Sequence, residues 1–280
     1  MLDIHAAVDL WRLSEVRAIA DTPGSRVFRA KNADGRSVVV KILKPRGLGE
    51  RTGMDYLAWR GGGGAVALLE CRENACLLED AGITSLEDVR KRSGEAAAAD
   101  IFAALLTRLH APSPHPVPDT LIPLDRHFEA LVDRRPAMPE AHRHDVQWAA
   151  AVARDLLATQ ADIMPLHGDL HHENILADEA GEWRAIDPHG LVGDPVHDAA
   201  NVFGNPLGRP DVTCDPARID RLATRLAAAL GCGRRKLLRH AAAHAALSAC
   251  WSIGDPVSDS DISDAGDRLA FLRIARAMSE

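Results

Sequence analysis

The stretch "MPLHGDLHHENIL", residues 164–176, places three histidines, two acids and one asparagine among apolar residues. Polar crowding beside an apolar segment is typical of a functional loop held by a rigid scaffold. Three kinds of chemistry could require it: a zinc site, an activated nucleophile, or a site that handles phosphate. A loop with purely structural hydrogen bonds is the fourth alternative.

Zinc and nucleophilic catalysis are the weaker interpretations. His167, Asp169, His171 and His172 could ligate zinc in principle, but the sequence offers no distant Cys/His cluster to complete a tetrahedral set. A serine nucleophile is disfavoured because no G-x-S-x-G elbow occurs in the chain. The nearby hydroxyl, Thr159, belongs to a predicted helix.

Phosphoryl transfer accounts for the spacing. In kinase-type sites a catalytic-loop Asp accepts a hydroxyl proton, and an Asn five residues later binds magnesium. Asp169 and Asn174 have this spacing, and Asp187 of "AIDP" lies where a second metal-binding Asp is expected. Hard oxygen ligands suit Mg²⁺ held between phosphates.

The N-terminal stretch "SVVVKIL", residues 37–43, supplies a second, independent sign. Lys41 stands in a V-x-K context on a predicted strand, where a half-buried ammonium needs an acidic partner. Glu50 is the first choice for that partner and Asp55 the alternative. In "TPGS", Gly24 and Ser25 are expected at a hairpin tip whose backbone N–H groups face phosphate, although a full glycine-rich loop is absent.

Composition narrows the class of protein. The 280 residues are 46% hydrophobic and 26% charged, and no apolar run approaches the roughly 20 residues of a membrane span. The N-terminus does not read as a secretory signal, so we expect a cytoplasmic protein. Five cysteines without tight pairing predict reduced thiols. The net charge of −7 argues against nucleic acid and for a cationic small molecule.

The pattern predicts an α+β chain of two unequal lobes. Residues 1–80 read as a small antiparallel β lobe of about five strands with one helix near residues 50–60, because turn signals such as "NADG" separate short β-branched stretches. Residues 81–280 read as a larger, mainly helical lobe. Its helices are expected at 94–110, 139–162, 216–230, 235–253 and 262–278, and short strands at 174–179 and 183–188.

Three blocks together resemble a known family. "DYLAWRGGGGAVALL", "LHGDLHHENIL" and "IDPHGLVGDPVHDAANVFGNP" are similar to the aminoglycoside O-phosphotransferases, in particular the streptomycin 6-kinase branch grouped with hydroxyurea kinases. The resemblance extends from about residue 19 to residue 252. It implies a protein-kinase-like fold that uses ATP and Mg²⁺.

The resemblance also implies roles for individual residues. Asp169 would be the catalytic base, Asn174 and Asp187 the magnesium ligands, and Lys41 the phosphate anchor. The stretch "CLLEDAG" would bind adenine through backbone groups at residues 78–81, which include Glu79 and Ala81.

The implied reaction moves the γ-phosphoryl group of ATP to an aminoglycoside hydroxyl, with the 6-hydroxyl of streptomycin as the expected position. The alternatives are hydroxyurea or a small hydroxylated metabolite as acceptor, and a pseudokinase that only binds nucleotide. Because planar guanidinium groups pair with carboxylates, the candidate acceptor contacts are Asp194, Asp255 and Asp259. Trp251 is a candidate stacking residue, with a place in the core as its alternative. Asp194 and Asp198 could also orient the catalytic loop through backbone amides or cap a helix, and a cap or scaffold role is expected for Asp198.

Overall fold

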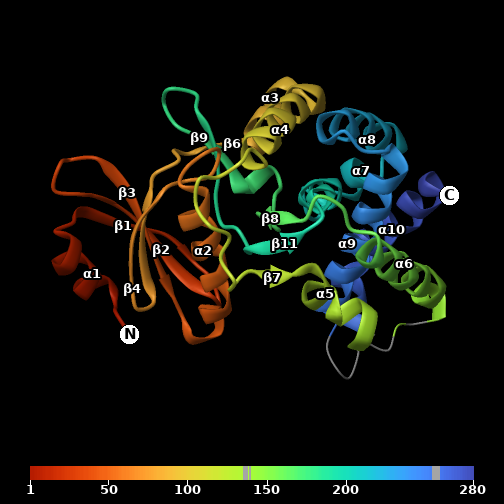
Figure 1. Ribbon diagram of the computed structural model, residues 1–280, viewed down its shortest axis with the longest axis horizontal. Helices are drawn as coiled ribbons and strands as arrows, with labels where there is room; N and C mark the ends of the chain where they lie inside the picture. Colours follow the sequence, from red (N-terminus) through yellow and green to blue (C-terminus); the bar gives the residue numbers. More distant parts are fainter. Residues whose placement is uncertain (135–137, 139, 254–258) are drawn as a thin grey trace.

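The computed structural model describes residues 1–134, 138, 140–253 and 259–280, and of residues 134 and 259–264 it describes the backbone alone. Its N-terminal part is a five-stranded antiparallel sheet in the order β1-β2-β3-β5-β4, seen in orange and red in Figure 1. The strands are β1 Ser14–Asp21, β2 Ser25–Lys31, β3 Ser37–Leu43, β4 Leu68–Arg72 and β5 Ala75–Glu79.

Two helices accompany this sheet instead of the single one expected. The predicted helix is α2, Arg51–Arg60, which follows the 3₁₀ turn η1, Pro45–Glu50. The second is α1, Ile4–Trp11, capped by the Asp3 carboxylate, which accepts a hydrogen bond from the N–H of Ala6. Ala7 and Trp11 of α1 pack against the apolar face of the sheet, so this helix completes a small separate core.

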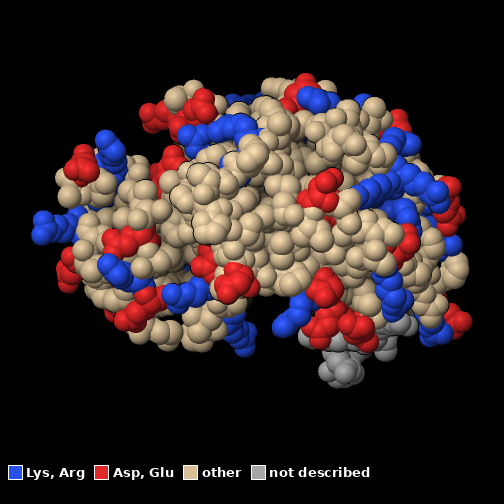
Figure 2. Space-filling model, in the orientation of Figure 1, with Lys and Arg blue, Asp and Glu red and all other residues tan. Residues whose placement is uncertain are grey.

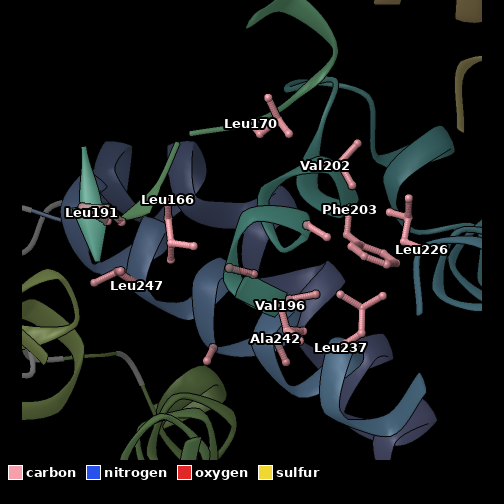
Figure 3. Close-up of a cluster of buried hydrophobic side chains, with 14 of the residues drawn as sticks. Leu166, Leu170, Leu191, Val196, Val202, Phe203, Leu226, Leu237, Ala242 and Leu247 are labelled. Carbon is pink, nitrogen blue, oxygen red and sulfur yellow. The ribbon is translucent and has the colours of Figure 1, made fainter. Parts of the chain in front are cut away.

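The remaining chain is mainly helical, as predicted. Its long helices pack around a second, larger core (Figures 1 and 3). The helices are α3 Leu86–Ser93, α4 Glu95–Leu109, α5 Leu124–His127, α6 Glu140–Ala158, α7 Pro210–Thr213, α8 Pro216–Leu230, α9 Arg234–Ser252 and α10 Asp259–Ser279. Shorter turns are η2 Ala130–Arg134, η3 His172–Asn174, η4 Pro195–Ala199 and η5 Asn201–Gly204.

Two small sheets carry the polar loop. One has the order β10-β9-β6 and the other β7-β11-β8. Their strands are β6 Thr84–Ser85, β7 Ile122–Pro123, β8 Met164–Leu166, β9 Ile175–Ala177, β10 Trp183–Ala185 and β11 Leu191–Gly193. The chain therefore leaves the first sheet at the end of β5 and enters a different sheet at β6. The division into domains at residues 80 and 81 stays a prediction.

The cysteine prediction is wrong for one pair. Cys71 and Cys76 form a disulfide between β4 and β5. The two residues lie directly opposite each other in the strand register, which the sequence spacing alone did not reveal. Cys214, Cys232 and Cys250 are free thiols.

Charged side chains are mixed over the face seen in Figure 2. Arg225 pairs with Asp100 at 2.6 Å, and Arg209 with Asp211 at the same distance. Exposed pairs of this kind contribute about 0–1 kcal/mol each to the free energy of unfolding. The stability of the fold therefore comes mainly from the two buried apolar clusters. Among the described helices, none is long and apolar enough to cross a membrane.

The N-terminal sheet region and the helical region meet where α2 contacts the segment after β10. A Cβ atom at Gly53 would lie 1.9 Å from the Pro188 carbonyl oxygen, and one at Gly190 would lie 2.2 Å from the Thr52 carbonyl oxygen. The Thr52 hydroxyl donates to the His189 carbonyl at 2.7 Å across the same contact. Backbone thus touches backbone here, and only glycine permits that approach.

We expect Gly53→Ala to lower the free energy of unfolding by about 1–3 kcal/mol, because the new methyl group must displace backbone atoms. Chemical denaturation of the purified variant measures this change. Gly49→Ala is the matched control, because a Cβ atom at Gly49 meets nothing within 4 Å. Equal stability of the two variants would show that the close contact does not constrain the fold.

Candidate active site

The loop that carries Asp169 is held by a buried carboxylate. Asp198, in η4, accepts hydrogen bonds from the backbone N–H groups of His167 at 3.1 Å and Gly168 at 2.7 Å. The His110 ring nitrogen Nε2 lies 3.0 Å from the same carboxylate. Asp198 is therefore a scaffold residue, one of the two roles expected for it.

His167 sets the start of the loop from within the core. Its Nδ1 accepts a hydrogen bond from the Asp169 N–H at 3.2 Å, so Nε2 carries the proton and donates to the Ile186 carbonyl at 3.0 Å. Burial lowers the pKa of His167, which favours this neutral tautomer. His167 thus ties the loop to the strand pair that precedes Asp187.

Two amide side chains hold the Asp169 carboxylate. Asn201 Nδ2 donates to Oδ1 at 2.7 Å, and Asn174 Nδ2 donates to Oδ2 at 3.0 Å. The rings of His171 and His189 approach Oδ2 more loosely, at 3.9 and 3.8 Å. Asp169 is partly exposed and fixed in orientation, which suits a carboxylate that must accept a proton from a substrate.

Asn174 and Asp187 are brought together by the β9–β10 pair. Ile186 N–H donates to the Asn174 carbonyl at 2.9 Å, so the next residue, Asp187, emerges beside Asn174. The Asn174 Nδ2 atom is already bonded to Asp169, which leaves the amide oxygen as the atom that can bind a metal. Asp187 is exposed and has φ of +59°, a conformation that Asp tolerates better than most residues. One carboxylate and one amide oxygen suit Mg²⁺ shared with phosphates.

Lys41 lies at the same corner, on the face of β3 opposite the small core. Its ammonium contacts Glu50 Oε2 at 2.7 Å and also pairs with Asp187. The side chain is only 6% exposed. Burial by itself lowers the pKa of Lys41, but the two carboxylates outweigh it and raise the pKa, so the ammonium stays charged. Of the two acids considered as its partner, Glu50 makes the contact, whereas Asp55 accepts from the Thr120 hydroxyl at 2.7 Å.

A cavity of about 120 Å³ extends from Lys41 toward the end of β5. Its wall includes Val27, Leu78, Ala81 and Ile186, an apolar lining against which a base ring could pack. Glu79 also lines it, but the carboxylate Oε2 accepts from the Ala67 N–H at 2.9 Å. The structure therefore gives the Glu79 side chain a structural partner.

The hairpin tip between β1 and β2 differs from the expected phosphate loop. Ser25 is buried, and its N–H donates to Thr22 Oγ1 at 3.0 Å. Gly24 packs against η1, where a Cβ atom would lie 2.1 Å from Glu50 Oε1. The tip thus supports Glu50, and the Ser25 amide already has an internal partner.

A second cavity, of about 220 Å³, is lined by Asp169 itself. Its lining includes Asp169, Asn201, His244, Trp251, Arg268 and one face of α9 formed by Ala241 and Ala245. Trp251 is 48% exposed, so a core position is wrong for it. Its ring stands edge-on to His127 at 5.1 Å and His244 at 6.3 Å between centroids. The Trp251 ring thus forms an aromatic wall of the cavity that Asp169 also lines.

The acids proposed as acceptor contacts have different positions. Asp194 is buried and accepts from the Val196 N–H at 3.1 Å, the Ala161 N–H at 3.2 Å and Lys236 Nζ at 2.5 Å. These contacts make it a cap and scaffold residue. Asp255 lies outside the described residues, and so does the side chain of Asp259.

A cluster of buried histidines stands behind the Trp251 wall. His197 lies 5.2 Å from His127, 5.7 Å from His244 and 6.2 Å from His240, measured between ring centroids. Neither ring nitrogen of His197 or His240 has a hydrogen-bond partner among the described residues. Nor do any three His, Cys, Asp or Glu side chains in the described part of the chain form a group that could hold a metal ion. The cluster is therefore a set of neutral rings packed as apolar groups, and zinc gains no support.

These histidines predict a loss of stability in acid. Burial lowers the pKa of His127 and His197 well below 6.5, that of His240 to about 4 and that of His244 to about 3. The facing charges are Asp194, Lys236, Arg239 and Arg268 together with the His189 ring. The unfolded chain binds protons below about pH 6.5 while the folded chain does not, so the unfolding free energy is unaffected by these rings above that pH and falls below it.

Each ring should contribute about 1.4 kcal/mol of lost stability per pH unit below 6.5. Urea unfolding at intervals between pH 7.5 and 5 measures this slope. In His244→Gln the slope should be smaller by about 1.4 kcal/mol per pH unit, which is the contribution of one ring. A slope equal in both proteins would contradict the neutral state of His244.

The chain is similar to known proteins over most of its length. Residues 10–255 match the family described as aminoglycoside/hydroxyurea antibiotic resistance kinase. The chain is 35% identical to a streptomycin 3''-kinase of Klebsiella pneumoniae, over 89% of this chain and 91% of that protein, and 34% identical to a streptomycin 6-kinase of Streptomyces griseus, over 78% and 71%. A solved complex of aminoglycoside phosphotransferase APH(4)-Ia with ADP and hygromycin B has the same fold, with a TM-score of 0.68, 17% identity and 98% coverage of both chains. This chain belongs to the aminoglycoside/hydroxyurea family of antibiotic resistance kinases.

Proposed function

We propose that this kinase transfers the γ-phosphoryl group of ATP to a hydroxyl of a streptomycin-type aminoglycoside, with Asp169 as the base. The observation that carries the proposal is the position of Asp169. Its carboxylate lines the cavity walled by Trp251, while the neighbouring Asn174 belongs to the corner that holds Lys41 and Asp187. Acceptor and nucleotide would therefore meet at this carboxylate.

The residues divide the work between them. Asn174 and Asp187 would hold Mg²⁺, which supplies neutralisation of phosphate charge when bound. Lys41, kept charged by Glu50 and Asp187, would pair with phosphate oxygens in the same corner. Asp169 accepts the acceptor's proton as the hydroxyl oxygen bonds to the γ-phosphorus and the bond to ADP breaks. The base ring would occupy the cavity at the end of β5, near Glu79 and Ala81.

The 6-hydroxyl of streptomycin is the position we propose, and a 3''-hydroxyl is the direct competitor because relatives of both kinds are similar to this chain. Hydroxyurea is the alternative acceptor, since the family description includes it. We place the reaction in the cytoplasm, where cells hold ATP.

A coupled assay of ADP release tests the proposal, with Mg-ATP and streptomycin, hygromycin B, hydroxyurea or no acceptor. Turnover with streptomycin and a product phosphorylated at the 6-position by NMR is the expected result. A product phosphorylated at the 3''-position would keep streptomycin as the substrate and change the hydroxyl that is phosphorylated. Turnover with hydroxyurea alone would replace the substrate.

Asp169→Asn should lower turnover by at least about 100-fold, because the amide cannot take the proton. Binding of ATP, measured by calorimetry, should change little, since Lys41 and Asp187 remain. Asp34→Asn, in the exposed β2–β3 turn, is the matched control. Turnover of Asp169→Asn at the rate of the unmodified protein would reject the base assignment.

Trp251→Ala should raise the KM for streptomycin about tenfold and leave kcat nearly unchanged, because the ring is proposed to stack on a sugar or a guanidinium group of the acceptor. Trp251→Phe, which keeps a ring, should lose much less. An unchanged KM in Trp251→Ala would remove this residue from the acceptor site. Asp255 and Asp259 stay proposed acceptor contacts.

A further inference from the structure

The Asp169 carboxylate is held by a residue with no place in the proposed metal site. Asn201, at the start of η5, donates from Nδ2 to Asp169 Oδ1 at 2.7 Å, across 32 positions of sequence. The other amide on this carboxylate, Asn174, is the proposed metal ligand and makes the longer contact of 3.0 Å. Asn201 is thus the donor whose amide can serve the base whether or not a metal is bound.

The orientation of the Asn201 amide is determined by a second asparagine. Asn205 Nδ2 donates to both the carbonyl oxygen and the side-chain Oδ1 of Asn201, each at 2.9 Å. Because Oδ1 accepts this hydrogen bond, the Nδ2 end must face Asp169. The direction of the Asn201–Asp169 contact follows from the whole network rather than from one distance.

The segment that carries both asparagines is anchored in the core. Val202 and Phe203 are almost fully buried and point into the cluster of apolar side chains in Figure 3. Arg218, itself 2% exposed, donates to the Asn205 carbonyl at 2.8 Å and to the Phe203 carbonyl at 3.1 Å. Glu95 balances the Arg218 charge at 3.0 Å. Desolvating this arginine is costly unless its hydrogen bonds are satisfied, so η5 and Arg218 hold each other in place.

We propose that Asn201 is a positioning residue for phosphoryl transfer, and that it keeps the Asp169 carboxylate in the orientation in which it receives the acceptor's proton. A carboxylate held by one amide alone can turn about its terminal bond, which has a broad and shallow torsional profile. Misplacing a reacting group by about 1 Å can cost 100-fold in rate, so a single 2.7 Å contact can be decisive. The inference rests on the proposed role of Asp169.

The test compares Asn201→Ala and Asn201→Asp with the unmodified protein. We expect kcat to fall about 30- to 100-fold in Asn201→Ala, with the KM for Mg-ATP within about twofold of the original value. Asn201→Asp preserves size but sets a second carboxylate against Asp169, and should be slower still. Asn205→Ala, which frees the Asn201 amide to turn, should lower kcat by a smaller factor and also leave the KM for Mg-ATP unchanged.

Controls separate positioning from folding. Asn32→Ala makes the same chemical change in the exposed β2–β3 turn and should leave kcat unchanged. A parallel fall in melting temperature, kcat and ATP affinity in Asn201→Ala would mean a structural role and overturn the proposal. A kcat within twofold of the original would overturn it as well.

The outcome for Asp169→Asn distinguishes the two levels of inference. If Asp169→Asn is inactive and Asn201→Ala is fully active, the base assignment holds and the role of Asn201 fails. If Asp169→Asn is fully active, the proposed function of Asp169 fails, and the role of Asn201 fails with it.

Discussion

The buried carboxylate of Asp198 is the contact on which the geometry of the site depends. It accepts hydrogen bonds from two successive backbone amides, at His167 and Gly168, at the point where the loop turns away from β8. An unpartnered amide in the core costs about 1–3 kcal/mol, so the loop and η4 cannot separate cheaply. Asn201 follows three residues later, so one short segment sets both the backbone of the loop and the carboxylate that projects from it.

The corner proposed for the nucleotide phosphates depends in turn on the close approach of α2 to the segment after β10. Gly53 and Gly190 remove the side chains that would hold these backbones apart. Lys41 is thereby placed between Glu50, on the turn leading into α2, and Asp187, on the opposite segment. A lysine between two acids from the two sides ties the sheet to the helical part through charge as well as through packing.

Local pattern was sufficient to predict the fold class, the five-stranded sheet and most of the long helices. The spacing of Asp169, Asn174, Asp187 and Lys41 along the chain predicted that they belong to one site, and the structure brings them together at one corner. Their catalytic and metal-binding roles stay proposals. Helix α1 was not predicted, because its eight residues form only a short amphipathic segment next to the first strand. The Cys71–Cys76 disulfide was not predicted, because the register that places the two residues opposite each other depends on how the strands pair in space.

The contacts of Asn201 and Asn205 were not predicted from the sequence, for a related reason. They follow no motif that specifies a role, and their meaning comes from Arg218 and Asp169, which are distant in sequence. One signal was available: two asparagines four residues apart flank the apolar pair Val202 and Phe203, so polar groups are held beside a buried segment. Trp251 shows the same limit, because the exposure of its ring depends on which distant segments pack against it.

Two alanines of α9 line the cavity proposed for the acceptor, and this has an evolutionary consequence. Ala241 and Ala245 lie one turn apart on the face toward the cavity, while the polar groups around Asp169 come from other segments. Replacing either alanine with a larger residue reshapes the floor of the cavity and leaves the phosphoryl-transfer groups where they are. If this cavity binds the acceptor as proposed, the range of acceptors can change through single small-to-large substitutions on one helix while Asp169 and its partners stay the same.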